Sequence, residues 1–273
     1  MPIFHAVILG VVQGLTEFIP VSSSGHLIAV PALLGWSIQS LSFDVSAHMG
    51  TLIAVIAYFR RDWARMLSGF ARHILRGVKY EATAPLEENG RLLVPMLVAC
   101  VPAAVVGFLW EDFIEQTLRE WYWVAAALVL VGLVMLAAER VGRKRREISD
   151  MGYFDFILIG CAQAMALFPG VSRSGITISA GLFRNLDRAA AARFSFLFST
   201  PIIFGAGMMA LKDLAQNGLP AQEAAAFGAG FVAAAVSGYV AIGFLMRYLQ
   251  SRTLDAFVVY RFALALLLVL VAR

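Results

Sequence analysis

The sequence predicts an all-α integral membrane protein, in which six spanning helices and two re-entrant helical hairpins form an inverted-topology repeat. Three observations support this: an apolar composition, apolar segments of membrane-spanning length, and a duplicated polar motif. Of the 273 residues, 60% are hydrophobic and 15% charged, with a mean hydropathy of +0.77. Soluble domains are about 45–50% apolar and about 25% charged, so the composition excludes a soluble enzyme. The net charge of only +4 gives no basis for nucleic-acid binding.

Six apolar segments reach the length of about 20 residues that a helix needs to cross the hydrocarbon core. They are 41–59, 92–110, 121–138, 191–211, 223–247 and 254–271. Each of two further regions has an apolar helix ended by a proline and then a short apolar helix that covers only part of the bilayer. These pairs are 1–19 with 27–35, and 153–168 with 175–184. Each pair predicts a re-entrant hairpin, and the first belongs to the mature protein because it lacks the basic start of a cleavable signal.

The basic residues are distributed unequally between the predicted loops. Four loops hold 17 Lys and Arg residues, whereas the three intervening loops hold two. The basic loops are 60–91, 139–150, 184–193 and 247–253, and the others are 36–40, 111–120 and 212–222. Lys and Arg accumulate in cytoplasmic loops. We therefore expect the first group in the cytoplasm, which places both ends of the chain on the outer side.

The two predicted hairpins carry one motif, repeated at an offset of 150 residues. GVVQGLTEFIPVSSSGHLI (10–28) and GCAQAMALFPGVSRSGITI (160–178) align without a gap and share eight of nineteen residues. The matches include Gln, Gly and two Ser in register, which chance similarity between apolar segments does not supply. Three predicted spans follow each copy, and an odd number of spans inverts the second copy. The chain is therefore predicted to be a single membrane domain, 1–273, with halves 1–150 and 151–273 whose hairpin tips meet.

The tips have the chemistry of an anion site. In each, a serine-rich turn precedes a short helix, so that backbone N–H groups and the positive end of the helix dipole point into the membrane. Any single serine is more simply interpreted as a helix cap. Arg173 favours a functional site over simple helix capping, because an intramembrane arginine is costly without a partner or ligand. Its planar guanidinium also suits the binding of phosphate. The hydroxyl donors predicted around it are Ser22, Ser23, Ser24, Ser172, Ser174 and Thr177.

Three further residues of the first tip supply proton or metal chemistry. Gln13 lies four residues before Glu17, hence on the same helical face, and His26 follows the serines. Taken singly, Glu17 is equally well explained as a structural partner of Arg173, and His26 as a satisfied core residue. Together, opposite an arginine, they favour catalysis.

Two other groups of ionisable residues have less defined roles. Asp44 and His48 form a second pair four residues apart, near the outer end of the predicted span 41–59. We interpret them as structural or supporting residues, because the repeat does not include them. Arg261 is either a buried partner of an acidic residue or part of the cavity lining, and the sequence leaves both open.

The strings QGLTEFIPVSSSGHL (13–27) and PGVSRSGIT (169–177) closely resemble the two signature regions, (E/Q)xxxE and PGxSRSxxT, of the bacterial undecaprenyl-diphosphate phosphatases linked to bacitracin resistance. Both match at every defined position, and the resemblance extends over nearly the whole chain. It implies a multi-pass inner-membrane enzyme, open to the outer side, that hydrolyses undecaprenyl diphosphate with a divalent cation and recycles the lipid carrier of cell-wall synthesis. The implied catalytic set is Gln13, Glu17, Ser23, His26, Ser172, Arg173, Ser174 and Thr177.

From the residues and the resemblance together, we assign catalysis to Glu17, Ser23, His26 and Arg173, and the binding of Mg²⁺ or Ca²⁺ to Glu17 and Gln13. Substrate binding is assigned to Ser22, Ser24, Gly25, Gly170, Ser172, Ser174 and Thr177. Attack by Ser23 with His26 as its base is favoured over attack by water that His26 activates, and His26 as nucleophile also stays open.

The rival function is a transporter or flippase of an anionic polyprenyl lipid. A carrier needs Arg173 and the helix ends but has less need of Glu17 and His26 together. The expected partners are the polyprenyl diphosphate and membrane lipids. The sequence leaves open the preferred metal, the prenyl chain length, the oligomeric state, with a homodimer as one option, and whether the product is also flipped.

Overall fold

The structure of the protein, a computed structural model, describes residues 1–76, 90–118, 120–217 and 221–271. These residues form helices and connecting turns without a strand, which confirms the all-α prediction. Two short 3₁₀ turns, η1 (Ile148–Asp150) and η2 (Met165–Leu167), accompany the α-helices. In chain order the helices are α1 (Ile3–Phe18), α2 (Ser23–Leu34), α3 (Leu41–Tyr58), α4 (Arg60–Arg76), α5 (Leu93–Ala99), α6 (Val101–Thr117), α7 (Trp121–Val141), α8 (Tyr153–Ala164), α9 (Arg173–Phe183), α10 (Arg188–Asn217), α11 (Ala221–Tyr248) and α12 (Asp255–Val271).

Several of these helices have the length and hydropathy of membrane spans. Within the described ranges, four segments qualify, or five if the bent pair α3 and α4 counts as one span. The four are Leu93–Trp110, Trp121–Val141, Arg188–Met209 and Glu223–Tyr248. The predicted span 254–271 corresponds to α12, which has 17 residues. The protein is therefore a multi-pass membrane protein, and the number of six spans stays a prediction.

Several predicted loops are partly helical: loop 111–120 as far as Thr117, loop 212–222 as far as Asn217 and again from Ala221, and loop 60–91 in its first half. The charged segment after residue 59 does not form a loop but continues as α4, which bends away from α3 by 76°. Its arginines mask a helical period: Met66 and Phe70, four residues apart, are buried and half-buried, whereas Arg65 and Arg72, seven residues apart, are exposed. Apolar and basic residues that alternate at this spacing form separate faces of one helix. A low mean hydropathy therefore hid a helix.

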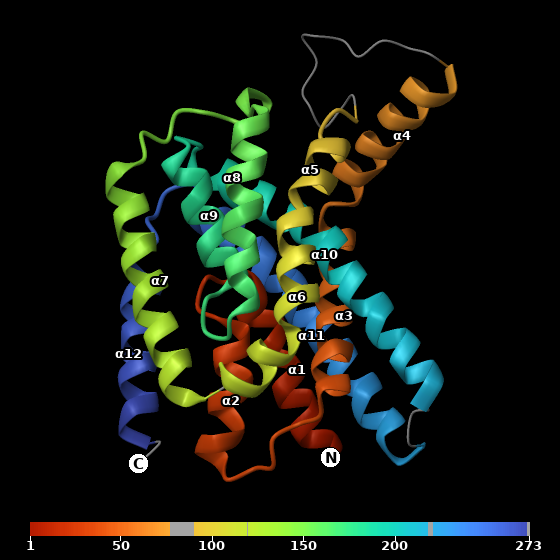
Figure 1. Ribbon diagram of the computed structural model, residues 1–273, viewed down its shortest axis with the longest axis vertical. Helices are drawn as coiled ribbons and strands as arrows, with labels where there is room; N and C mark the ends of the chain where they lie inside the picture. The colour runs from red at the N-terminus through yellow and green to blue at the C-terminus, as the bar shows by residue number, and fades with distance from the viewer. Residues whose placement is uncertain (77–89, 119, 218–220, 272–273) are drawn as a thin grey trace.

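The two hairpins approach each other from opposite ends of the molecule. In Figure 1, α1 and α2 occupy the lower part, α8 and α9 the upper part, and the turns that connect each pair meet near the middle. Both turns begin beside a proline, since Ile19 precedes Pro20 and Phe168 precedes Pro169, and both preceding residues are extended, with ψ of 133° and 125°. Proline disfavours helical backbone in the residue before it, so each proline ends its helix.

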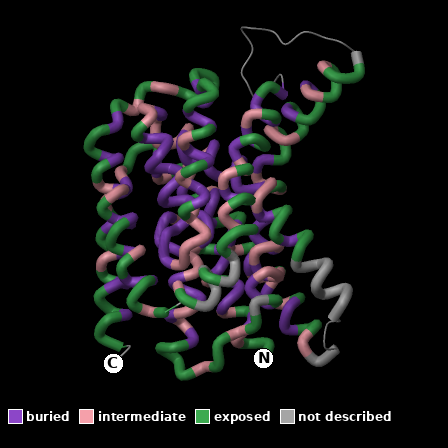
Figure 2. Tube along the Cα trace, in the orientation of Figure 1, coloured by how far each residue is buried: buried purple, intermediate pink, exposed green. Residues whose placement is uncertain are grey.

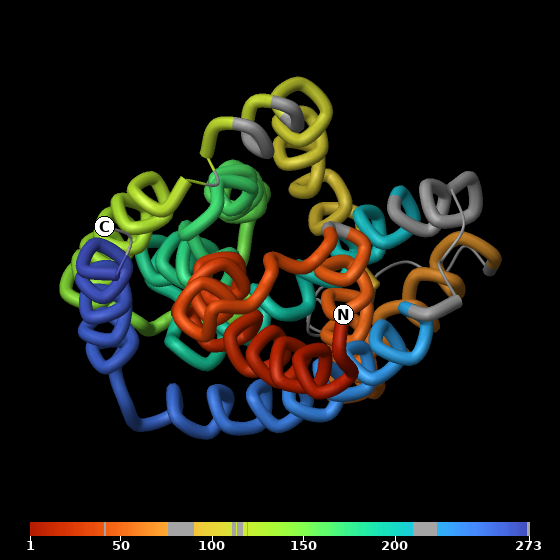
Figure 3. Tube along the Cα trace, turned by 90° about the horizontal axis from the view of Figure 1, so that it is seen from below, coloured from red at the N-terminus to blue at the C-terminus, as the bar shows by residue number. Residues whose placement is uncertain are grey.

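Glycines allow the helices around the site to approach closely. A Cβ added to Gly10 would lie 2.3 Å from the carbonyl oxygen of Gly230, and one added to Gly14 would lie 2.5 Å from that of Ala234. These close approaches join α1 to α11, which lie side by side in Figure 3. Buried positions gather in the centre of the molecule, around α8, α9 and the two turns (Figure 2). The tight packing thus surrounds the place where the turns meet.

Candidate active site

The two serine turns have the same local geometry. Ser22 and Ser172 are the N-caps of α2 and α9, and each Oγ accepts a hydrogen bond of 3.2 Å from the backbone N–H three residues later, of Gly25 and Gly175 respectively. Both serines have a positive φ, 78° and 64°, which is unusual for a residue with a side chain. The helices consequently begin at the residues predicted to form the site, and their N-terminal N–H groups and dipoles are directed at it.

The turns also touch each other. The backbone N–H of Gly170, in the second turn, donates a hydrogen bond of 3.2 Å to Ser24 Oγ at the start of α2. Arg173, the first residue of α9, donates from Nη2 to Glu17 Oε1 at 2.8 Å. The predicted meeting of motifs 150 residues apart is therefore present in the structure, and an ion pair joins them.

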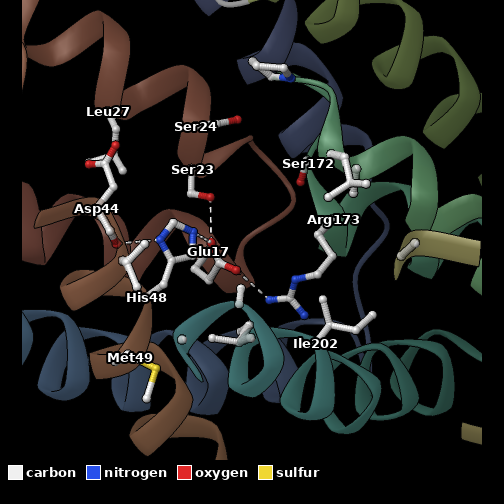
Figure 4. Close-up of a pocket in the computed structure, with 18 of the residues that line it drawn as sticks. Glu17, Ser23, Ser24, Leu27, Asp44, His48, Met49, Ser172, Arg173 and Ile202 are labelled. Carbon is white, nitrogen blue, oxygen red and sulfur yellow. Dashed lines mark hydrogen bonds and ion pairs between the residues drawn. The ribbon is translucent and has the colours of Figure 1, made fainter. Parts of the chain in front are cut away.

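Glu17 is the centre of the polar cluster (Figure 4). Its Oε2 accepts hydrogen bonds from Ser23 Oγ at 2.6 Å and from Gln13 Nε2 at 3.0 Å, while Oε1 accepts from Arg173. His48 Nε2 lies 3.6 Å from the same Oε2. Gln13 and Glu17 share one face of α1, as their spacing predicted, and Ser23 reaches the carboxylate from the next helix. The carboxylate therefore organises side chains from four helices.

Arg173 has capacity left for an anion. Its Nε and Nη1 are buried and, among the described residues, have no hydrogen-bond partner. A buried cationic N–H without an acceptor is unfavourable, so these groups are poised for an acceptor that the described part of the chain does not supply. A phosphate, which accepts two parallel N–H bonds from a guanidinium, fits this requirement.

A cavity of about 480 Å³ opens beside these groups. Its polar lining includes Glu17, Ser23, Arg173 and His48, whereas much of the remaining wall consists of apolar side chains. Among the apolar lining residues are Leu27, Met49, Ile202, Ile203 and Ala206. A cavity of this volume is typical of a small-molecule site. The combination suits a ligand with an anionic head and an apolar remainder.

The predicted site residues divide into two groups by position. Glu17, Ser23, Ser24, Ser172 and Arg173 line the cavity. The others are not among its lining residues: Gln13, Ser22, Gly25, His26, Gly170, Ser174 and Thr177. Thr177 Oγ1, for example, bonds the carbonyl oxygen of Arg173 at 2.7 Å and the hydroxyl of Ser195 at 2.6 Å. Residues of the second group hydrogen-bond to the first group or to the turns next to it, as Gln13 does to Glu17 and Ser22 to Gly25.

His26 is oriented away from Ser23. Its Nδ1 is 2.7 Å from the carbonyl oxygen of Ser22, and its Nε2 is 2.7 Å from the hydroxyl of Tyr260 on α12. Both ring nitrogens are thus occupied, and Ser23 is hydrogen-bonded to Glu17 instead. The arrangement of Ser23 with His26 as its base, which we favoured from their proximity in sequence, is not the one seen in this conformation.

His48 and Asp44, interpreted from the sequence as structural or supporting residues, lie next to Glu17 and in the wall of the cavity. His48 Nδ1 donates to the carbonyl oxygen of Asp44 at 2.7 Å, since a carbonyl can only accept, and this directs Nε2 towards Glu17. The Asp44 carboxylate accepts from Gln39 at 2.8 Å, and all three residues line the cavity. The only signal in the sequence was the spacing of four residues, which places Asp44 and His48 on one face of a span.

The fold and this site define a class: multi-pass membrane proteins that hold a buried carboxylate, a hydroxyl and an arginine around a cavity within a helical bundle. The chain belongs to the family of bacitracin resistance protein BacA, whose family model matches residues 6–267.

Several curated relatives are similar over almost their whole length. The chain is 49% identical to an undecaprenyl-diphosphatase of Rubrobacter xylanophilus over 269 residues, 98% of this chain and 97% of the relative. It is 45% identical to an undecaprenyl-diphosphatase of Moorella thermoacetica over 273 residues, 99% and 98% of the two chains. A third undecaprenyl-diphosphatase, of Geobacter sulfurreducens, is 45% identical over 262 residues, 96% and 95% of the two chains. The resemblance found in the two motifs thus extends to complete proteins.

Proposed function

We propose that this protein is an undecaprenyl-diphosphatase, which hydrolyses undecaprenyl diphosphate to undecaprenyl phosphate and inorganic phosphate and so recycles the lipid carrier of cell-wall synthesis. Relatives with this name, 45–49% identical over nearly the whole chain, support the proposal. The main structural support is a cluster of Glu17, Ser23 and Arg173 in a cavity whose remaining walls are largely apolar. An amphiphilic diphosphate matches both parts of this cavity.

The geometry supports a serine route with Glu17 as the proton acceptor. Ser23 Oγ attacks the terminal phosphorus and gives its proton to Glu17 Oε2, with which it already shares a hydrogen bond of 2.6 Å. The bond between the terminal phosphorus and the bridging oxygen breaks, and undecaprenyl phosphate leaves. Water then hydrolyses the phosphoserine and releases inorganic phosphate. Arg173 and the N–H groups at the starts of α2 and α9 stabilise the charge on the transferring group.

A divalent cation fits the donor set only together with substrate. Within the described residues, no three His, Cys, Asp or Glu side chains gather as a metal site. Glu17 and the Oε1 of Gln13, a buried oxygen without a hydrogen-bond partner there, are ligands of the kind that Mg²⁺ and Ca²⁺ take. Mg²⁺ is commonly bound by one or two carboxylates plus substrate phosphates. When bound, the cation would neutralise charge on the diphosphate.

For the membrane arrangement, we propose six spans and two re-entrant hairpins in an inverted repeat, in one membrane domain with the site open to the outer side. The approach of the hairpins from opposite ends supports this, as does the position of the start of α1 and the end of α12 at the same end of the molecule (Figure 1). Labelling of single cysteines from each side of the membrane tests it. Accessibility of residues 142–147 from outside would contradict it.

Phosphate release by the purified protein tests the function. Undecaprenyl diphosphate labelled in its terminal phosphate is offered to the wild type, to Glu17→Gln and to Asp255→Asn, a control that alters an ion pair with Arg140 away from the cavity. We expect labelled phosphate from the wild type and the control only. Chelator is expected to reduce release, and Mg²⁺ or Ca²⁺ to restore it. Binding without cleavage in all three proteins would overturn the proposal in favour of a transporter or flippase.

A further inference from the structure

Arg261, in the middle of α12, is a buried cation with an unusual set of partners. Its side chain is completely inaccessible. Among the described residues no carboxylate pairs with it, and its N–H groups instead meet backbone carbonyl oxygens of residues distant in sequence. A buried charge that forms hydrogen bonds to backbone alone is costly. The backbone groups that Arg261 contacts therefore indicate which part of the structure it stabilises.

These carbonyls belong to both serine turns. Nη2 donates to Gly170 O at 2.9 Å and to Val171 O at 3.4 Å in the second turn, and Nη1 donates to Pro20 O at 3.5 Å in the first. The remaining bonds go to α7, from Nε to Leu128 O at 3.1 Å and from Nη2 to Ala127 O at 3.3 Å. One rigid, planar group therefore joins both turns to a neighbouring helix.

The preceding residue reaches the first hairpin as well. The Tyr260 hydroxyl is 2.7 Å from His26 Nε2, and the two rings are stacked, with an interplanar angle of 8°. His26 Nδ1 in turn bonds the carbonyl oxygen of Ser22, so Tyr260 is connected through the imidazole to the N-cap of α2. Adjacent residues of α12 thus hold the first turn at two points.

We infer that Tyr260 and Arg261 form a brace that sets the relative position of the two turns, and that both are positioning residues for the reaction. The inference rests on the proposed function, because Ser23 lies three residues after Pro20, and Arg173 three residues after Gly170. Displacement of one turn against the other would move the hydroxyl and the guanidinium apart. Lysine cannot replace Arg261, since its three N–H donors radiate from a single nitrogen, whereas the guanidinium presents five from three nitrogens in one plane.

Hydrogen exchange measured by mass spectrometry distinguishes two roles of Tyr260 and Arg261: positioning of the two turns, or stabilisation of the whole protein. In Arg261→Lys we expect faster exchange in peptides that cover residues 19–26 and 168–176, with exchange in α10 and α11 unchanged. Tyr260→Phe, which removes one hydroxyl, should affect only the first of these peptides. The matched control is Arg140→Lys on α7, because Arg140 is exposed, pairs with Asp255 and bonds neither turn. Exchange that rises uniformly, or that stays unchanged in both turns, would overturn the inference.

Activity supplies the second readout. A misplacement of about 1 Å costs on the order of 100-fold in rate, so Arg261→Lys is expected to hydrolyse undecaprenyl diphosphate about 100-fold more slowly than Arg140→Lys. In Arg261→Ala, added guanidinium should restore part of the lost activity and slow exchange in both turns, which a merely misfolded variant would not show. Full activity of Arg261→Lys would overturn the inference. If the wild type releases no phosphate, the proposed function is wrong. The exchange experiment does not depend on activity and still tests whether Tyr260 and Arg261 hold the two turns together.

Discussion

The two serine turns are alike in backbone and unlike in chemistry. Ser22 and Ser172 have positive φ angles within 14° of each other, 78° and 64°. Each also accepts the same 3.2 Å hydrogen bond from a glycine three residues later. What the copies share is the construction of a helix N-terminus that faces the site. A shared turn geometry therefore directs two helix N-termini, the kind of site that favours an anion, at the same place.

What the copies do not share is reactivity. At the offset of 150 residues, Ser23 corresponds to Arg173, and Glu17 to Leu167. The first copy thus holds the hydroxyl and the carboxylate to which it is hydrogen-bonded, whereas the second holds the cation that pairs with this carboxylate at 2.8 Å. The difference teaches that neither copy can carry out the proposed reaction alone.

The largest effect should follow from the loss of the hydroxyl in the first turn. The proposed route needs this hydroxyl as its nucleophile, so we expect Ser23→Ala to lose about 10³-fold or more in rate. His26→Ala should lose less, because its imidazole bonds Ser22 and Tyr260. Rapid-quench trapping from labelled substrate should detect phosphoserine in the wild type. Steady turnover without phosphoserine would instead favour attack by water.

A change at the equivalent position of the second turn should have the next largest effect. Arg173→Lys keeps the charge but loses the planar fork, and loss of such a donor to developing charge costs about 10²–10³-fold in kcat. Arg173→Ser, which gives both turns a serine at this position, should be worse still. Steady-state phosphate release is the measurement, with Arg252→Lys, at an exposed residue outside the cavity, as control. Near-normal turnover in Arg173→Lys would remove the second turn from the proposed mechanism.

Gly10 and Gly160 test whether the two copies also share packing. A Cβ on Gly10 would lie 2.3 Å from Gly230 O, and one on Gly160 would lie 2.3 Å from Ala99 O. Overpacking costs about 1–3 kcal/mol, so each alanine variant should lower the free energy of unfolding by a similar amount, seen as earlier thermal unfolding in detergent. Gly205→Ala is the control, because a Cβ there meets no atom of the described residues within 4 Å. Strongly unequal losses would show that only one copy needs the close approach.

The smallest effect concerns the caps themselves. Replacing an N-cap serine by alanine costs about 1 kcal/mol, and we expect Ser22→Ala and Ser172→Ala to destabilise the protein equally. Glycine at either position should cost less, since it adopts a positive φ without steric penalty. Thermal unfolding of the four variants provides the measurement, with Ser68→Ala, at an exposed residue on α4, as control. A glycine variant less stable than its alanine counterpart would contradict this account of the turn.

The parts of the fold that could be predicted depend on local chemistry. Proline ends α1 before the first turn, and the serine and glycine pattern starts α2 and α9, as the sequence indicates. The helix α4 was missed because its many arginines lower the average hydropathy, although its periodicity is helical. Averages over a segment cannot distinguish an amphipathic helix from a polar loop.

The site was predictable where residues are close in sequence or marked by the repeat. The spacing of Gln13 and Glu17 placed them on one face, and their hydrogen bond is present. The closeness of His26 to Ser23 in sequence led us to pair these two residues, whereas His26 contacts Tyr260, which is 234 residues away. Which of two nearby polar groups a side chain selects depends on tertiary packing, which no spacing rule contains.

The position of the brace in the chain has a consequence for biosynthesis. Synthesis proceeds from the N-terminus, and Arg261 follows Pro20 by 241 residues and Val171 by 90. Both turns are therefore made, and available for insertion, well before the residue that joins them. A nascent chain would carry both complete motifs and still lack an assembled site until α12 enters the membrane. A truncated gene that preserves both motifs but ends before this helix should accordingly encode an inactive protein.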